Sequence, residues 1–136
     1  MEKIADTTYY EVWVEPENSI LIYKWKPTIL ELDLESYKEG FLEALKYLYE
    51  YKPKYVVQHS KEQVYPITGE LQKWISNNIT PKFIEAGVKK IAYVMPEDFV
   101  SKLALEQLVL KLLSITQGMK RMFFDDLDTA LKWLKK

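Results

Sequence analysis

The sequence predicts an α/β protein with a mixed five-stranded sheet and four helices, in the order ββαβαβαβα. Short runs of β-branched and aromatic residues alternate with longer segments whose apolar residues recur every three or four positions. Strands that alternate with helices usually pair in parallel through right-handed crossovers, with the helices packed over the sheet. The chain has 136 residues and no visible repeat or linker, so we expect a single domain over 1–136.

The first elements read as a β-hairpin followed by a helix and a short strand. Residues 9–15 and 20–25 are rich in aromatic and β-branched residues, and Pro16 and Asn18 supply turn chemistry between them. Asp33 is a plausible N-cap for a helix over 34–51. The next strand is predicted over 55–58.

The remaining elements alternate regularly. A second helix is expected to begin near Thr68 and end at Gly87, with a kink at Pro81, whose ring clashes with the preceding turn. A strand is predicted over 90–95, and its apolar run 91–95 is typical of a strand buried on both faces. A third helix, a last strand over 119–124 and a terminal helix complete the order.

Composition excludes many chemistries. There is no cysteine, so thiolate catalysis and cysteine-based metal sites are excluded, and His59 is the only histidine. The four glycines are too dispersed for a phosphate-binding glycine loop. With Arg121 the only arginine and a formal charge of −1, we expect no nucleic-acid partner. We also expect no metal and no cofactor.

Because residues 1–8 contain no apolar stretch, we expect no targeting segment there. The longest apolar region, 99–115, is interrupted by Lys102, Glu106 and Lys111, so we expect no membrane insertion. The absence of cysteine is compatible with a cytoplasmic protein, which is the localisation we expect.

Acidic residues follow two predicted strands, as Glu97 and Asp98 and again at positions 125, 126 and 128. Clustered carboxylates can bind Mg²⁺ or act as acid and base. These residues, however, all fall in the first turn of a predicted helix, where carboxylates cap amides and complement the helix dipole. Capping is therefore the preferred interpretation.

The loop over 58–68 is the most informative candidate site, because ligands gather at the carboxyl ends of strands in open α/β sheets. It contains the only histidine next to Ser60. A hydrolase that uses Ser60 and His59 is one hypothesis, although neighbouring residues rarely point at each other. A solvated loop is the simpler interpretation of this segment. The helix that begins at Thr68 offers the best remaining place for a small anion.

The third helix is apolar around most of its circumference, including Leu105 and Leu110. A surface helix needs only one apolar stripe. Deep burial against the sheet and a homodimer interface are both compatible with this pattern. The tryptophans are interpreted as anchors of the core or of an interface.

The chain resembles the small bacterial SpoIIAA-like, or STAS-like, domains over most of its length. The resemblance rests on residues 23–25, on Trp74, and on the segments 85–94 and 124–134. It implies a mixed sheet with a βα superhelical winding. The best-understood STAS domains are non-enzymatic switches that bind a kinase or a sigma-factor regulator, controlled by phosphorylation of a serine after the third strand. Ser60 is the nearest counterpart, without the family's preceding aspartate and following glycine.

Three functions follow as hypotheses. The first is a non-catalytic regulatory or protein-interaction domain, in which Ser60 would be a solvent-accessible phosphoswitch near the start of the second helix. The alternative is a binder of a small apolar or anionic ligand near the loop 58–68. A hydrolase is the third. The candidate ligand or partner surface consists of Trp25, Gln58, His59, Tyr65, Thr68 and Trp74.

Overall fold

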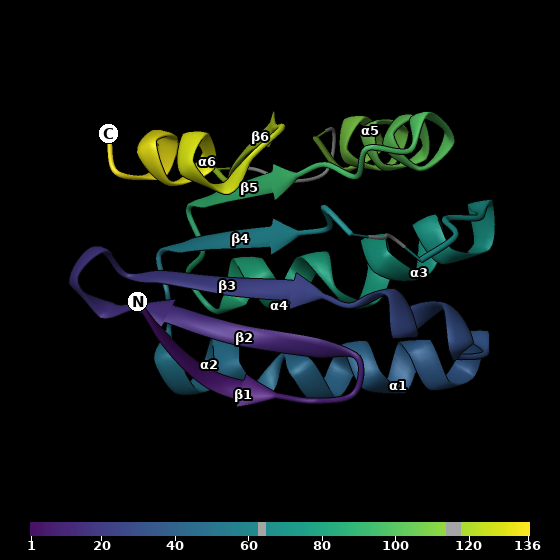
Figure 1. The fold of residues 1–136 in the computed structure, drawn as a ribbon, viewed down its shortest axis with the longest axis horizontal. Coiled ribbons are helices and arrows are strands. Elements are labelled where there is room, and N and C mark those ends of the chain that lie inside the picture. Colours follow the sequence, from purple (N-terminus) through teal and green to yellow (C-terminus); the bar gives the residue numbers. More distant parts are fainter. Residues whose placement is uncertain (63–64, 114–117) are drawn as a thin grey trace.

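The computed structural model describes residues 1–62, 65–113 and 118–136. The strands are β1 (Glu2–Asp6), β2 (Tyr10–Glu15), β3 (Ile20–Trp25), β4 (Tyr55–His59), β5 (Lys90–Val94) and β6 (Lys120–Phe124). The helices are α1 (Leu34–Ala44), α2 (Lys46–Tyr51), α3 (Gly69–Asn78), α4 (Thr80–Glu85), α5 (Phe99–Leu113) and α6 (Leu127–Leu134). The mixed α/β class is confirmed (Figure 1).

All these strands belong to one sheet, and their order in space is their order along the chain. β1, β2 and β3 pair antiparallel, whereas β3, β4, β5 and β6 pair in parallel. The expected hairpin is β2 and β3, joined by a short 3-10 helix over Pro16–Asn18. The parallel half of the sheet brings the carboxyl ends of four strands to the same edge (Figure 1).

The prediction of five strands is wrong, because the residues that the structure describes form a sheet of six strands. The additional strand, β1, runs along the free side of β2 and is only partly covered. Its register shifts between Lys3 and Ala5, which marks a bulge or irregularity. A polar strand at the edge of a sheet lacks the alternating apolar residues by which strands are recognised in a sequence.

The first two predicted helical segments are each divided in two. The kink expected at Pro81 is present, since α3 ends at Asn78 and α4 begins at Thr80. Proline has no N–H to donate to the preceding turn. The first segment is divided at Leu45, whose N–H donates to the carbonyl oxygen of Leu42 at 3.2 Å, a tighter turn than that of an α-helix.

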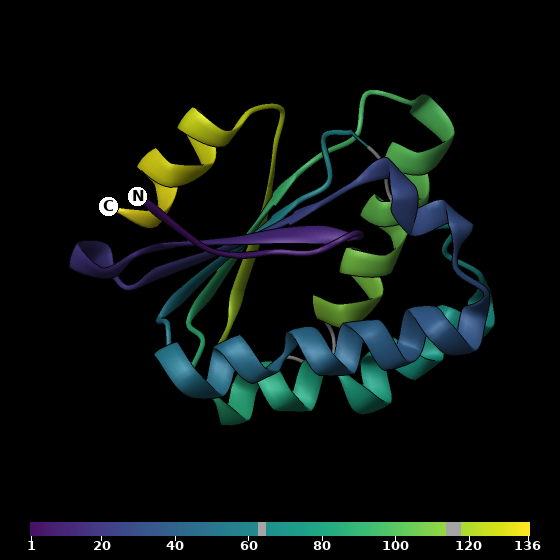
Figure 2. The same ribbon diagram turned by 60° about the horizontal axis from the view of Figure 1, so that its bottom comes forward.

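The two faces of the sheet are covered unequally. One face carries the larger core, built from side chains such as Val12, Tyr23 and Val56 packed against α1 to α5. The other face carries a smaller core, in which Ile22 and Val57 pack with Leu134 of α6. Figure 2 shows α6 on one side of the sheet and α1 to α4 on the other. The candidate site lies on the first face of the sheet, among the side chains of the larger core.

Candidate functional site

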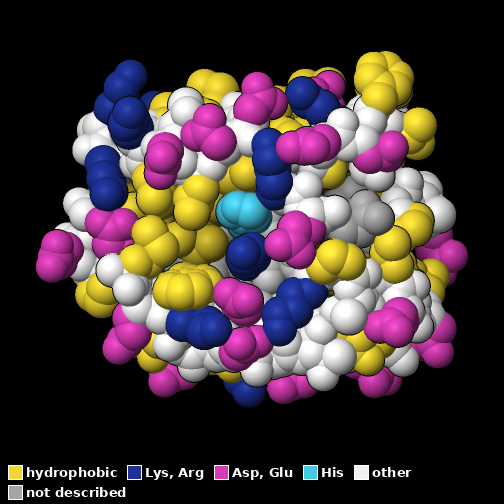
Figure 3. Space-filling view, viewed as in Figure 1, with side chains coloured by type: hydrophobic (Ala, Val, Ile, Leu, Met, Phe, Trp, Pro, Cys, Tyr) yellow, Lys and Arg dark blue, Asp and Glu magenta, His cyan; other side chains and the backbone are white. Residues whose placement is uncertain are grey.

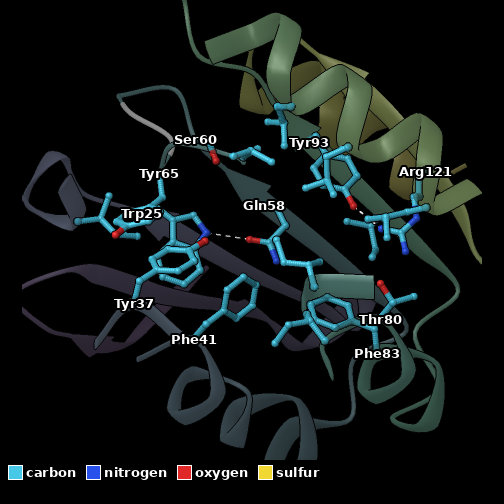
Figure 4. Close-up of a pocket in the computed structure, with 18 residues that line it drawn as sticks. Trp25, Tyr37, Phe41, Gln58, Ser60, Tyr65, Thr80, Phe83, Tyr93 and Arg121 are labelled. Atoms are coloured by element: carbon cyan, nitrogen blue, oxygen red, sulfur yellow. Dashed lines mark hydrogen bonds between the residues drawn. The ribbon is translucent and has the colours of Figure 1, made fainter. Parts of the chain in front are cut away.

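A pocket lies between the sheet and the helices that cover its larger core. The cavity volume that a water-sized molecule can reach in it is about 80 Å³. Strands β3 to β6 form its floor and helices α1, α3, α4 and α5 contribute to its walls (Figure 4). The lining residues are Trp25, Ile29, Tyr37, Phe41, Gln58, Ser60, Tyr65, Ile67, Ile75, Ile79, Thr80, Phe83, Ile91, Tyr93, Leu105, Leu108, Leu112 and Arg121.

Aromatic rings form one end of this pocket. The rings of Tyr37 and Tyr65 are stacked, with centroids 4.0 Å apart, and the rings of Trp25 and Phe41 lie 5.5 Å apart. The Tyr65 hydroxyl donates to the carbonyl oxygen of Leu32 at 2.7 Å, which anchors the segment after β4. Such rings offer a large apolar surface with few rotatable bonds. This end is therefore suited to the apolar body of a ligand.

The Gln58 amide crosses the floor of the pocket in a fixed orientation. The indole nitrogen of Trp25 donates to Gln58 Oε1 at 2.8 Å, and this hydrogen bond links β3 to β4. Because an indole N–H can only donate, the atom that faces it must be the amide oxygen. The NH₂ group of Gln58 is thereby directed away from Trp25, as Figure 4 shows. It is a donor that a ligand can use.

Two buried hydroxyl groups also line the pocket. Ser60 is 5% exposed and Thr80 is 4% exposed, and among the described residues neither hydroxyl has a hydrogen-bond partner. Neither oxygen is among the fully buried, unpartnered atoms of the described residues, so both hydroxyls are accessible from the pocket. Both groups can therefore form a hydrogen bond with a molecule in the pocket.

The burial of Ser60 overturns the expectation of an accessible phosphoswitch. Its backbone N–H donates to the carbonyl oxygen of Val94 at 2.9 Å, so the residue continues the β4–β5 ladder instead of entering an open loop. Its side chain then falls on the same face as Gln58, beneath the helices. In this structure a kinase would have no access to the hydroxyl.

Arg121 on the edge strand β6 supplies the positive charge of the pocket. Its guanidinium donates to the hydroxyl of Tyr93 on the neighbouring strand. Burial raises the pKa of Tyr93, and the nearby guanidinium partly opposes that rise. Figure 4 shows Arg121, Tyr93 and Thr80 at the end of the pocket opposite the Trp25 and Tyr37 rings.

His59 lies on the other face of the sheet from Ser60, because side chains alternate along a strand. Figure 3 shows the histidine ring in the middle of that face, with lysine and acidic side chains around it. Its Nδ1 atom is buried without a partner among the described residues. Burial, followed by the charge of Lys24, lowers the pKa of His59. The hypothesis of a Ser60–His59 hydrolase pair is therefore wrong.

Two further predicted site residues lie outside the pocket lining. Thr68 is exposed and caps α3, since its hydroxyl accepts from the Leu71 N–H at 3.2 Å. Trp74 packs behind the pocket, with its ring 6.3 Å from that of Phe41 and the Lys38 ammonium 5.7 Å from its centroid. Three of the six predicted surface residues, Trp25, Gln58 and Tyr65, thus meet in one site.

The capping interpretation of the acidic residues is confirmed for Asp98 and Asp126. Each accepts a backbone N–H at 2.8 Å, from Ser101 and Thr129 respectively. These hydrogen bonds lower the pKa of both carboxyl groups. In the described part of the chain no group of three or more acidic or histidine side chains is placed to hold a metal ion.

Sequence reasoning missed the pocket residues Thr80, Tyr93 and Arg121. One signal was available for Arg121, because the only arginine of the chain stands inside a strand of apolar residues and shares a face with Phe123. No feature of the sequence marked Thr80 as a pocket residue, since it lies beside the kink expected at Pro81.

Comparison with models of protein families, with curated proteins and with solved structures gives no match. The resemblance to STAS-like domains therefore stays a prediction. None of the described helices has the length and apolar character needed to cross a bilayer.

Proposed function

We propose that this protein is a binding domain for a small and mainly apolar molecule, held in the pocket between the sheet and helices α1, α3, α4 and α5. The observation that carries the proposal is a pocket with mainly apolar walls that Ser60 and Thr80 also line, each with a hydroxyl that is not hydrogen-bonded to any described residue. Ligand sites are typically apolar clefts in which a few polar groups fix the orientation of the ligand.

The polar groups of the pocket are suited to recognition. The Gln58 amide, the two hydroxyls and Arg121 can all donate hydrogen bonds to one molecule. General acid–base chemistry needs a titratable group near its reaction partner. The described lining residues include no carboxylate, histidine or lysine, and burial raises the pKa of the lining tyrosines Tyr37, Tyr65 and Tyr93, so these hydroxyls stay protonated near neutral pH. We therefore propose binding without catalysis.

The test uses N-phenyl-1-naphthylamine, a neutral apolar dye whose fluorescence rises in apolar surroundings. We expect saturable binding of one dye per chain. Ser60→Leu places an apolar side chain inside the pocket without removing any hydrogen bond found among the described residues, so it should weaken binding at least about tenfold.

The matched control is Leu110→Ser, which removes a side chain that is 60% exposed on α5, away from the pocket lining. It should leave dye binding unchanged. Circular dichroism and thermal unfolding check that each variant is folded. Binding that survives Ser60→Leu but is lost in Leu110→Ser would place the dye on the surface and contradict the proposal.

A regulatory or protein-interaction domain is the second candidate. One observation favours it: the outer side of α5 leaves large apolar side chains exposed, among them Phe99 (75%), Val100 (73%) and Leu110 (60%). Contiguous apolar patches on soluble proteins commonly mark contact sites. The two candidates are compatible, since ligand-binding domains can also bind proteins.

A further inference from the structure

We infer that the molecule bound in this pocket is an apolar carboxylic acid, in its ionised form, with the carboxylate at Arg121 and the apolar body toward Trp25. This inference rests on the proposed function and names the class of ligand.

The first argument is the charge of the pocket. Arg121 is the only charged side chain among the described lining residues, which include no Asp, Glu or Lys. In apolar surroundings water screens a charge weakly, so its attraction for an opposite charge is larger than at the surface. The pocket therefore favours a molecule with one negative charge over a neutral or cationic one of the same shape.

The second argument is the arrangement of donors and rings. Strand order places Trp25 on β3, Gln58 on β4, Tyr93 on β5 and Arg121 on β6, so the floor runs from an indole to a guanidinium. The Tyr93 hydroxyl accepts from the guanidinium, and the Thr80 hydroxyl lies at the same end (Figure 4). An elongated molecule with one polar end matches this floor.

The third argument concerns the head group. A planar guanidinium can form two parallel hydrogen bonds with a planar carboxylate, which gives both attraction and orientation. A phosphate monoester would bring more charge and more acceptor oxygens than one arginine can satisfy. Because the described lining residues include no second cation, the pocket fits a carboxylate better.

The experiment compares 2-naphthoate with 2-naphthamide, which have the same rings and nearly the same head-group shape but differ in charge. Each compound competes with N-phenyl-1-naphthylamine for the pocket of the full chain. In the wild type, naphthoate should displace the dye at a concentration at least about tenfold lower than naphthamide.

Arg121→Met should remove this preference while the neutral dye and naphthamide still bind, which shows that the pocket is intact. The matched control is Lys120→Met, which removes one positive charge from an exposed neighbour on β6 and should keep the preference. Arg121→Lys keeps the charge but loses the paired geometry, so it should reduce the preference. If Arg121→Met does not fold, Arg121→Lys is the variant that tests the assignment.

Each outcome separates the two proposals. If the dye does not bind the wild type, the proposed function fails. If the dye binds but naphthoate shows no advantage over naphthamide, the carboxylate inference is overturned and the proposed function stands. A preference that persists in Arg121→Met, or is lost equally in Lys120→Met, also overturns the assignment to Arg121.

Discussion

His59 is the residue whose protonation is expected to alter stability near neutral pH. Its pKa is lowered in the folded protein from the model-peptide value of 6.5, mainly by burial and then by Lys24. Below about pH 6.5 the unfolded chain binds a proton at this site more readily than the folded one. The free energy of unfolding therefore decreases as the pH falls through this range.

His59→Gln removes that titration. Between pH 7 and pH 5 the wild type should lose more free energy of unfolding than the variant, measured by urea denaturation at each pH. The capping carboxylates Asp98 and Asp126 titrate in both proteins, so the difference isolates His59. Parallel losses in the two proteins would contradict the lowered pKa.

The sequence identified the strand end that carries Gln58 and Ser60, but not how these side chains are buried. Alternation along a strand explains why Ser60 and His59 face opposite sides. The burial of Ser60 depends instead on the helices that cover this face, and no local residue pattern reports that packing. Arg121 was visible as the only arginine, yet its position beside Tyr93 follows from the register between β5 and β6.

At the scale of the elements, the start of α3 depends on one hydroxyl. Thr68 accepts from the Leu71 N–H, one of the N–H groups that the first turn of a helix leaves without a partner. Thr68→Ala should lower the free energy of unfolding by about 1 kcal/mol, whereas Thr68→Ser should keep most of the stability. Urea denaturation of the three proteins tests this, and equal stability of the alanine and serine variants would contradict it.

Element boundaries were predicted where a single residue decides them. Asp33 and Thr68 do begin helices, and the break near Pro81 occurs because proline lacks an N–H. The third helix illustrates the limit, since its sequence is apolar on nearly every side. The structure buries Leu105 and exposes Leu110, and only the position of the sheet decides between them. The predicted last turn of that helix lies outside the described residues.

At the scale of the whole molecule, the exposed side of α5 makes homodimerisation a testable proposal. Analytical ultracentrifugation at micromolar concentration should show a dimer, and Leu110→Glu should give a folded monomer, because this side chain is 60% exposed. The matched variant Leu105→Glu should unfold, because a charge would enter a site that is 5% exposed. A wild-type monomer would refute the dimer.

The alternation of strands and helices along the sequence predicted the α/β class. It did not predict that the helices cover the two faces of the sheet unequally. α6 alone packs on the smaller core, while α1 to α5 enclose the larger core and its pocket. Crossover handedness favours one side for successive helices between parallel strands. The terminal helix, α6, follows the last strand and is not a crossover between two parallel strands of the sheet, so the rule does not apply to it.

The sequential order of the strands bears on how the chain is made. During synthesis, every strand after β1 emerges when its neighbour in the sheet already exists. The β1–β2–β3 meander can close first through local pairing, and each later strand is added at the same growing edge. A nascent chain on the ribosome therefore never holds a gap between two strands for a later one to fill.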